Sequence, residues 1–323
     1  MIALTDVQKK FGSRLAVDNL TLAVPRGEIF GLLGHNGAGK STAIGMMLGQ
    51  VWPTRGEVKV CGHDVTTHRA RALQKVGAIF EAPAFYDYLS GWHNLEILSH
   101  YSAPTSAARI REVVDWVGLT GRERSPVKTY SHGMRARLAL AQALLPQPEL
   151  LILDEPGNGL DPEGIAEMRH TIARLHRELG LTILLSSHQL SEVEQLCTRI
   201  AVLNQGRKVF EGLIADVKAK RGRVTLRTPD FAAATALLRE RGIITGAADG
   251  KFISLAEGRT IAEATRILVA GNFPVDGIWQ HEQTLEDFYL SLLKTVGDEV
   301  TSRGVGEHGR LLTSSPTNIQ KNH

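Results

Sequence analysis

The sequence predicts an α/β fold with a mainly parallel β-sheet, an antiparallel β subdomain, a helical subdomain and a small C-terminal α+β domain. Between about residues 28 and 203, apolar runs of strand length alternate with amphipathic segments of helical period. This alternation is typical of parallel strands covered by helices. Residues 1–30 instead alternate apolar and polar positions between turn signals, which predicts antiparallel strands.

The expected elements of the first two thirds of the chain follow in a regular order. A strand at 28–33 leads into a helix at 42–48, and a further strand follows at 56–60. The segment 94–117 has helical period and is interrupted by Pro104. The later expected elements are helices at 134–145, 163–179 and 190–197, and strands at 150–153, 181–185 and 200–203.

The residue composition of the chain changes after about Val217, where a basic linker begins. We therefore expect a first domain over residues 1–217 and a small α+β accessory domain over 223–297. Residues 298–323 are polar and without periodicity, which predicts a disordered tail. The accessory elements are expected as strands at 224–226, 252–255 and 275–279 and helices at 231–241, 260–270 and 284–293.

The segment GHNGAGKST at 34–42 fits the phosphate-binding pattern G-x-x-x-x-G-K-[ST] at every position. Its glycines let backbone N–H groups turn toward an anion, Lys40 supplies a cation, and the Ser41 hydroxyl is a ligand for Mg²⁺. A glycine-rich turn with an incidental lysine is the alternative, but the strand before it and the helix after it favour a nucleotide site. The expected ATP-binding residues are Gly34, His35, Asn36, Gly37, Ala38, Gly39, Lys40, Ser41 and Thr42.

Two carboxylates follow the apolar run at 150–153, where ligands of an open α/β sheet bind. Asp154 is placed to hold Mg²⁺, and Glu155 to act as general base toward the water that attacks the γ-phosphate. The alternative is that both are solvated carboxylates that cap the next helix.

With these residues the first 217 positions resemble the ATP-binding subunits of ABC transporters, which are P-loop ATPase cassettes. Five further elements occur in that family's order. They are an aromatic residue at Phe11, Glu81 where glutamine is usual, YSHGM at 130–134 where LSGGQ is usual, the D-loop GLD at 159–161, and the switch element SSH at 186–188.

The resemblance implies a role for each element. Ser131 and Gly133 donate to the γ-phosphate bound by a second cassette, and Asp161 lies at the same nucleotide interface. His188 positions Glu155 and the attacking water, Phe11 stacks on adenine, and Glu81 accepts from a water bound to the metal. Taken alone, Ser131 is also a good helix N-cap, His188 a structural histidine and Phe11 a core residue.

The resemblance also implies partners: a second copy of the cassette or a related ATPase subunit, and an integral-membrane permease. The chain would then lie at the cytoplasmic face of the membrane, held there by the permease. The stretch 80–91, with Glu81, resembles ATPases of bacitracin- and lantibiotic-type exporters. The aromatic residues in and beside it are expected to dock the permease, or alternatively to belong to the core of the helical subdomain: Phe85, Tyr86, Tyr88 and Trp92. The expected function is ATP-driven export of a peptide antibiotic or another toxic compound.

Two other function classes compete with export. One is a soluble ABC ATPase that acts on ribosomes or nucleic acid, but the chain has a single phosphate loop and no heptad run, and its net charge is only +3. The other is a nucleotide-gated scaffold with little turnover, which Glu155 and His188 argue against. We therefore expect ATP and Mg²⁺ as ligands and no nucleic acid.

Overall fold

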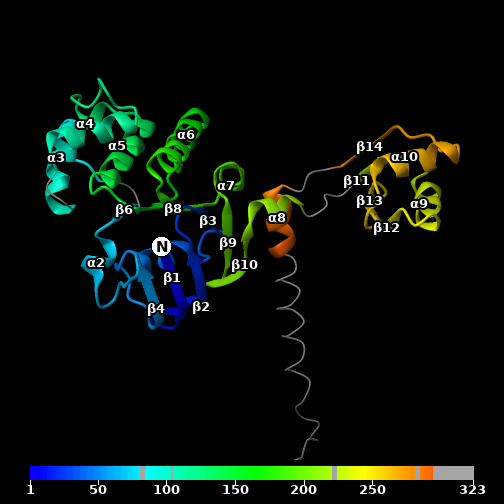
Figure 1. Cartoon of the computed structure of the whole chain (residues 1–323), viewed down its shortest axis with the longest axis horizontal. Coiled ribbons are helices and arrows are strands. Elements are labelled where there is room, and N and C mark those ends of the chain that lie inside the picture. The colour runs from blue at the N-terminus through cyan, green and yellow to red at the C-terminus, as the bar shows by residue number, and fades with distance from the viewer. Residues whose placement is uncertain (81–83, 103–104, 220–223, 281–283, 294–323) are drawn as a thin grey trace, which may run out of the picture.

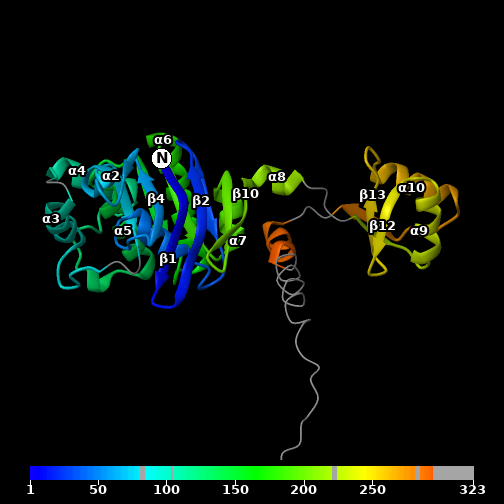
Figure 2. The same ribbon diagram turned by 90° about the horizontal axis from the view of Figure 1, so that it is seen from below.

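The computed structural model describes residues 1–80, 84–102, 105–219, 224–280 and 284–293. The predicted tail at 298–323 lies outside these residues, as does most of the predicted basic linker. The strands form three sheets, and the third stands apart from the other two in both views (Figures 1 and 2). The predicted α/β class, with its antiparallel and helical subdomains, is confirmed.

The N-terminal sheet is antiparallel, with strand order β2-β1-β4-β5. At the start of β1 alternate residues point inward, so that Ile2 and Leu4 are buried while Ala3 and Thr5 face solvent. A register shift after Leu4 breaks the alternation, and Val7 is the next buried residue. The strands of this sheet are β1 (Ile2–Phe11), β2 (Arg14–Val24), β4 (Arg55–Val60) and β5 (His63–Asp64).

The central sheet has the order β10-β9-β3-β8-β7-β6, and only β10 runs antiparallel to its neighbour. The sequence did not predict β6 or β10 as strands. Every residue of β10 after the first is only half-buried, so the strand lacks the apolar run that marks the inner strands. The strands are β3 (Ile29–Leu33), β6 (Val76–Ile79), β7 (Leu150–Asp154), β8 (Thr182–Ser187), β9 (Arg199–Asn204) and β10 (Arg207–Leu213).

Both faces of the central sheet are buried, which explains why its strands read as continuous apolar runs. One face, with Leu184 and Ile152, packs against α1 and the antiparallel sheet. The other face, with Leu185 and Leu153, packs against the helices of the helical subdomain and those that follow it. The helices are α1 (Lys40–Met47), α2 (Arg69–Leu73), α3 (Gly91–Ser102), α4 (Ala107–Trp116), α5 (His132–Leu144), α6 (Pro162–Leu179), α7 (Leu190–Leu196) and α8 (Ile214–Ala219).

The C-terminal sheet, with order β12-β13-β11-β14, has a core of its own that includes Leu226, Leu238 and Leu268. Its first and last residues, Val224 and Gln280, are register partners in neighbouring antiparallel strands. The chain therefore enters and leaves this unit at the same point. Its elements are β11 (Val224–Arg227), α9 (Phe231–Glu240), β12 (Ile244–Ala248), β13 (Phe252–Leu255), α10 (Ile261–Ala270) and β14 (Gly277–Gln280).

The helix at 285–293 differs from the expectation that grouped 284–293 with the accessory domain. Leu285 and Phe288 are 1% and 4% exposed, and both belong to the core of the cassette. The Phe288 ring meets the Phe210 ring edge to face at 4.7 Å, and the Leu285 N–H donates to Glu194 at 3.2 Å. An apolar stripe with spacing i, i+3, i+4 and i+7 docks this helix on the cassette rather than on the accessory sheet.

We expect Phe288→Ala to release this helix, because truncating a core phenylalanine costs about 3–5 kcal/mol. Limited proteolysis followed by mass spectrometry should show faster cleavage within 284–293, with the cassette itself still folded. Leu290→Ala is the matched control, since Leu290 lies on the same helix and is 50% exposed. Equal cleavage of the two variants would contradict the packing described here.

Candidate functional site

The loop at 34–39 connects β3 to α1, and close backbone approach requires its glycines. A Cβ on Gly34 would lie 2.6 Å from the Leu203 carbonyl oxygen, and one on Gly39, whose φ is 103°, would lie 2.7 Å from the Ala16 carbonyl oxygen. The loop therefore holds its backbone against two neighbouring strands. The N-terminus of α1 points out of it, which is the arrangement that binds phosphate.

Lys40 is the charged centre of this loop and is only 5% exposed. Its ammonium group donates to the Gly34 carbonyl at 2.7 Å and to the His35 carbonyl at 3.4 Å. It also lies 3.6 Å from the Glu155 carboxylate. The loop and Glu155 thus hold the cation along the inner surface of the loop.

Asp154 and Glu155 lie at the C-terminal end of β7, as the sequence predicts. Glu155 has φ of 49°, in the left-handed region that costs a residue with a side chain about 1–3 kcal/mol. Its N–H donates to both the carbonyl and the hydroxyl oxygen of Ser186, at 3.2 and 3.0 Å. These bonds hold the turn that aims the Glu155 side chain at Lys40.

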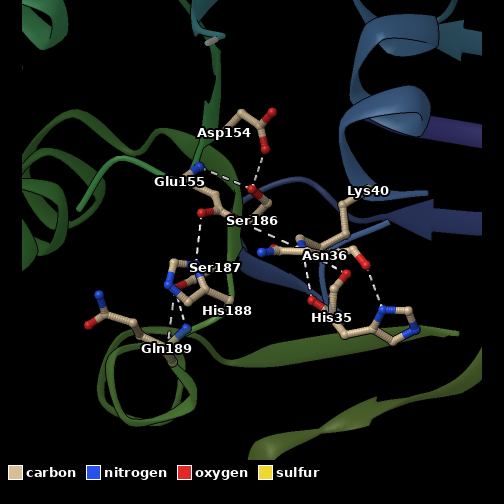
Figure 3. Close-up of polar contacts among 10 residues, drawn as sticks. His35, Asn36, Lys40, Asp154, Glu155, Ser186, Ser187, His188 and Gln189 are labelled. Carbon is tan, nitrogen blue, oxygen red and sulfur yellow. Dashed lines mark hydrogen bonds and ion pairs between the residues drawn. The ribbon is translucent and has the colours of Figure 1, made fainter. Parts of the chain in front are cut away.

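Three predicted residues from three strand ends converge at this point (Figure 3). Lys40 follows β3, Glu155 follows β7 and His188 follows β8. The His188 ring nitrogen Nδ1 lies 2.8 Å from Glu155 Oε2, and its side chain remains 46% exposed. One carboxylate is therefore held between a buried ammonium group and an accessible imidazole.

Two cavities open around these side chains. One, of about 210 Å³, is lined by the phosphate loop and by Arg14 of β2. The other, of about 450 Å³, is lined by Asp154, His132 of α5 and Leu160. Ser41 and Glu155 line both. The two cavities therefore meet between the phosphate loop and the carboxylates.

The donor set at this junction fits Mg²⁺. Ser41 and Asp154 offer hard oxygen atoms and line the same cavity. Among the described residues there is no group of three or more His, Cys, Asp or Glu side chains that could hold a metal ion. Mg²⁺ usually keeps several waters and binds through one or two protein oxygen ligands plus substrate phosphates.

Several predicted residues are not among those that line the two cavities. Ser131 is exposed and caps α5, where its hydroxyl accepts from Met134 N–H at 3.2 Å, and Gly133 lies beside it. Asp161 is exposed and caps α6. Ser131, Gly133 and Asp161 line neither cavity. Phe11 is 50% exposed under the Lys9 ammonium, so the core alternative for Phe11 is excluded. Glu81 lies outside the described residues.

The aromatic segment predicted to dock the permease divides into two parts. Tyr86 and Tyr88 are 42% and 73% exposed, with their rings edge to face. Trp92 is buried, and Phe85 packs against the core of the cassette. Between the two tyrosines, Asp87 is ion-paired at 2.8 Å with an arginine of α5. The exposed tyrosines thus sit next to the helix that Ser131 caps.

The structure adds contacts that sequence reasoning missed. The His35 ring lies 3.1 Å from the Asn204 side-chain oxygen. Burial raises the pKa of the Tyr289 phenol, and the backbone N–H of His35, which faces that oxygen, opposes the rise. The docked C-terminal helix therefore touches the phosphate loop. Nothing local in the sequence signals either contact, because each joins segments more than 160 residues apart.

Comparison with known proteins identifies the family to which a chain with these motifs belongs. The profile of the family described as ABC transporter matches residues 17–158. The bacitracin transport ATP-binding protein BcrA of Enterococcus faecalis is 36% identical over 91% of this chain and 96% of its own length. The chain belongs to the ATP-binding proteins of ABC transporters. It is an ABC ATPase, an enzyme that hydrolyses ATP to drive transport.

A further relative and a solved structure support the assignment of this ABC ATPase to the family. The lantibiotic transport ATP-binding protein SrtF of Streptococcus pyogenes is 38% identical over 65% of this chain and 90% of its own length. A solved ATP-binding subunit of an ABC transporter superposes with a TM-score of 0.60 at 28% identity, covering 68% of this chain and 92% of that one. Within the described part of the chain, no helix combines the length and apolar character needed to span a membrane.

We expect Lys40→Ala to weaken ATP binding about 10- to 100-fold, the range for losing a hydrogen bond from a charged group. Fluorescence titration with a labelled ATP analogue would measure the change. Lys59→Ala is the control, because Lys59 is exposed and its ammonium group pairs with Glu57 of the same strand at 2.8 Å. A Lys40→Ala chain that bound ATP as tightly as the control would refute the assignment of this loop.

Proposed function

We propose that this ABC ATPase powers a membrane exporter by closing two copies of the cassette around ATP. The observation that carries the proposal is the division of the predicted site. Lys40, Glu155 and His188 converge, whereas Ser131 is exposed and lines neither cavity beside them. A second copy that faces the first would bring its own Ser131 to the phosphate loop, so each copy would complete the site of the other.

In this proposal Glu155 accepts the proton of the water that attacks the γ-phosphate. Its bond to His188 Nδ1 holds the carboxylate in line, so that His188 acts by positioning. Lys40 attracts the β- and γ-phosphates, and Phe11 offers its exposed ring to the adenine. Ser41 and Asp154 would hold Mg²⁺, which when bound neutralises charge that develops on the phosphate oxygens.

The partner copy would contribute the N-terminus of α5. The Ser131 hydroxyl and the Gly133 N–H are available there, and the positive end of the helix points in the same direction. His132 stands in place of the usual glycine, and its side chain is exposed and lines the larger cavity. Asp161, at the start of α6, would lie along the same seam.

Export through an integral-membrane permease is supported by the relatives and by one surface. Two of the similar proteins are named for bacitracin and lantibiotic transport. The exposed rings of Tyr86 and Tyr88 offer an apolar patch next to α5, suited to a permease helix. We propose a peptide antibiotic or another toxic compound as cargo, with the ATPase held at the cytoplasmic face of the membrane by that permease.

We expect Glu155→Gln to lower turnover roughly 10²- to 10⁴-fold and to leave a long-lived dimer with ATP. Adding Ser131→Ala should abolish that dimer in size-exclusion chromatography with ATP. Ser106→Ala is the matched control, because Ser106 caps α4 just as Ser131 caps α5. Each replacement removes an N-cap worth about 1 kcal/mol, so only a contact across the dimer distinguishes them. A Glu155→Gln, Ser131→Ala chain that still dimerised would exclude the shared site.

We also expect a host that lacks this chain to become more sensitive to bacitracin or a lantibiotic. Minimal inhibitory concentrations should recover with the wild-type chain and not with Glu155→Gln, because resistance needs ATP turnover. Both chains should co-purify with the same membrane protein. Sensitivity unchanged across a panel of peptide, lipid and drug compounds would reject toxic-compound export.

A further inference from the structure

We infer that Ser186 is a positioning residue that orients both carboxylates of the hydrolytic site, and that the affinity for the divalent metal depends on its hydroxyl. The inference rests on the proposed function, since it assumes that Asp154 faces the metal. It is carried by a buried hydroxyl that bridges the two consecutive acidic residues (Figure 3).

The sheet places the three residues together. Ser186 in β8 and Asp154 in β7 are register partners in neighbouring parallel strands. Both residues lie two positions after core residues, Leu184 and Ile152, of the face that packs against α1. Ser186 therefore points to the side of the sheet from which the phosphate loop rises. Its side chain is fully buried.

The polarity of the hydroxyl is fixed by its two partners. Its oxygen accepts the Glu155 N–H at 3.0 Å, and its single proton is donated to Asp154 Oδ1. Asp154 is therefore held as an acceptor, with one oxygen fixed by Ser186 and the other free of that bond. The same hydroxyl supports Glu155 in its left-handed conformation. The Ser186 hydroxyl thus orients both the Asp154 carboxylate, which faces the metal, and the Glu155 carboxylate, which accepts the proton.

The neighbouring serine does not duplicate this role. Ser187 belongs to the other face of β8, and its hydroxyl accepts the Gln189 N–H at 2.9 Å. Groups that orient a metal ligand commonly change metal affinity when they are removed, even though they do not touch the metal. Ser186 orients Asp154 in this way without itself being a metal ligand.

The test compares the full-length chain with Ser186→Ala and Ser186→Thr, using a fluorescent ATP analogue titrated with and without Mg²⁺. We expect Ser186→Ala to raise the Mg²⁺ concentration for half-maximal nucleotide tightening about 10- to 100-fold. Binding of the metal-free analogue should stay within about twofold, because Lys40 and the loop are untouched. Ser186→Thr keeps the hydroxyl and should restore most of the metal response.

Thr182→Val is the matched control. Thr182 lies on the same face of β8, is 1% exposed, and its hydroxyl accepts the Gly27 N–H at 2.9 Å at the opposite end of the strand. Thr182→Val therefore removes a hydrogen bond to a buried hydroxyl that contacts no carboxylate. We expect its metal response to match the wild-type chain, and thermal unfolding to confirm that all variants are folded.

An unchanged metal response in Ser186→Ala would overturn the inference. An equal loss of metal-free binding, or the same defect in Thr182→Val, would also overturn it, because the effect would then be general damage to the strand. A normal metal response in the wild-type chain, with no ATP-dependent dimer of the Glu155→Gln variant, would reject the proposed function instead. The two failures are thus distinguishable.

Discussion

The positive charge of Lys40, held almost out of solvent, is the constraint on which the rest of the site depends. A buried ammonium group must be compensated, and here two loop carbonyls and the Glu155 carboxylate do so. The loop must therefore fold back on itself, which only its glycines allow. The same inward turn directs the N-terminus of α1 at the ligand, so charge compensation and anion binding share one geometry.

The parallel arrangement of the strands brings the other residues of the site to Lys40. Because β3, β7 and β8 run in the same direction, their C-terminal ends lie along one edge of the sheet. Lys40 thereby meets Glu155 and His188, which both lie more than 100 positions further along the chain. The strain at Glu155 is local to this edge and is stabilised by two bonds to Ser186. An extended backbone conformation at Glu155 would direct its carboxylate away from Lys40.

What the sequence predicted correctly was local in character. The phosphate loop, the strand before Asp154 and the helix that ends at Gly180 are each encoded by consecutive residues, and each forms as expected. What it missed depends on distant partners. Strand β10 lacks an apolar run, and the helix at 285–293 follows the accessory elements in sequence but packs on Phe210. The contact of Ser131 with a second copy stays a prediction, since one chain cannot contain it.

The accessory unit is thus an insertion between two parts of the cassette rather than a C-terminal extension. Ile214 and Val217 of α8 precede it, Leu285 and Phe288 follow it, and all four belong to one apolar core. A truncation near Arg223 would remove the docked helix as well, so its effects on dimerisation or ATPase activity could not be ascribed to the accessory sheet. Val224 and Gln280 are register partners, which places their Cα atoms about 5 Å apart. Removing 224–280 and joining its ends would take away the accessory unit alone, so any effect of that deletion would be separate from the packing of the C-terminal helix on the cassette.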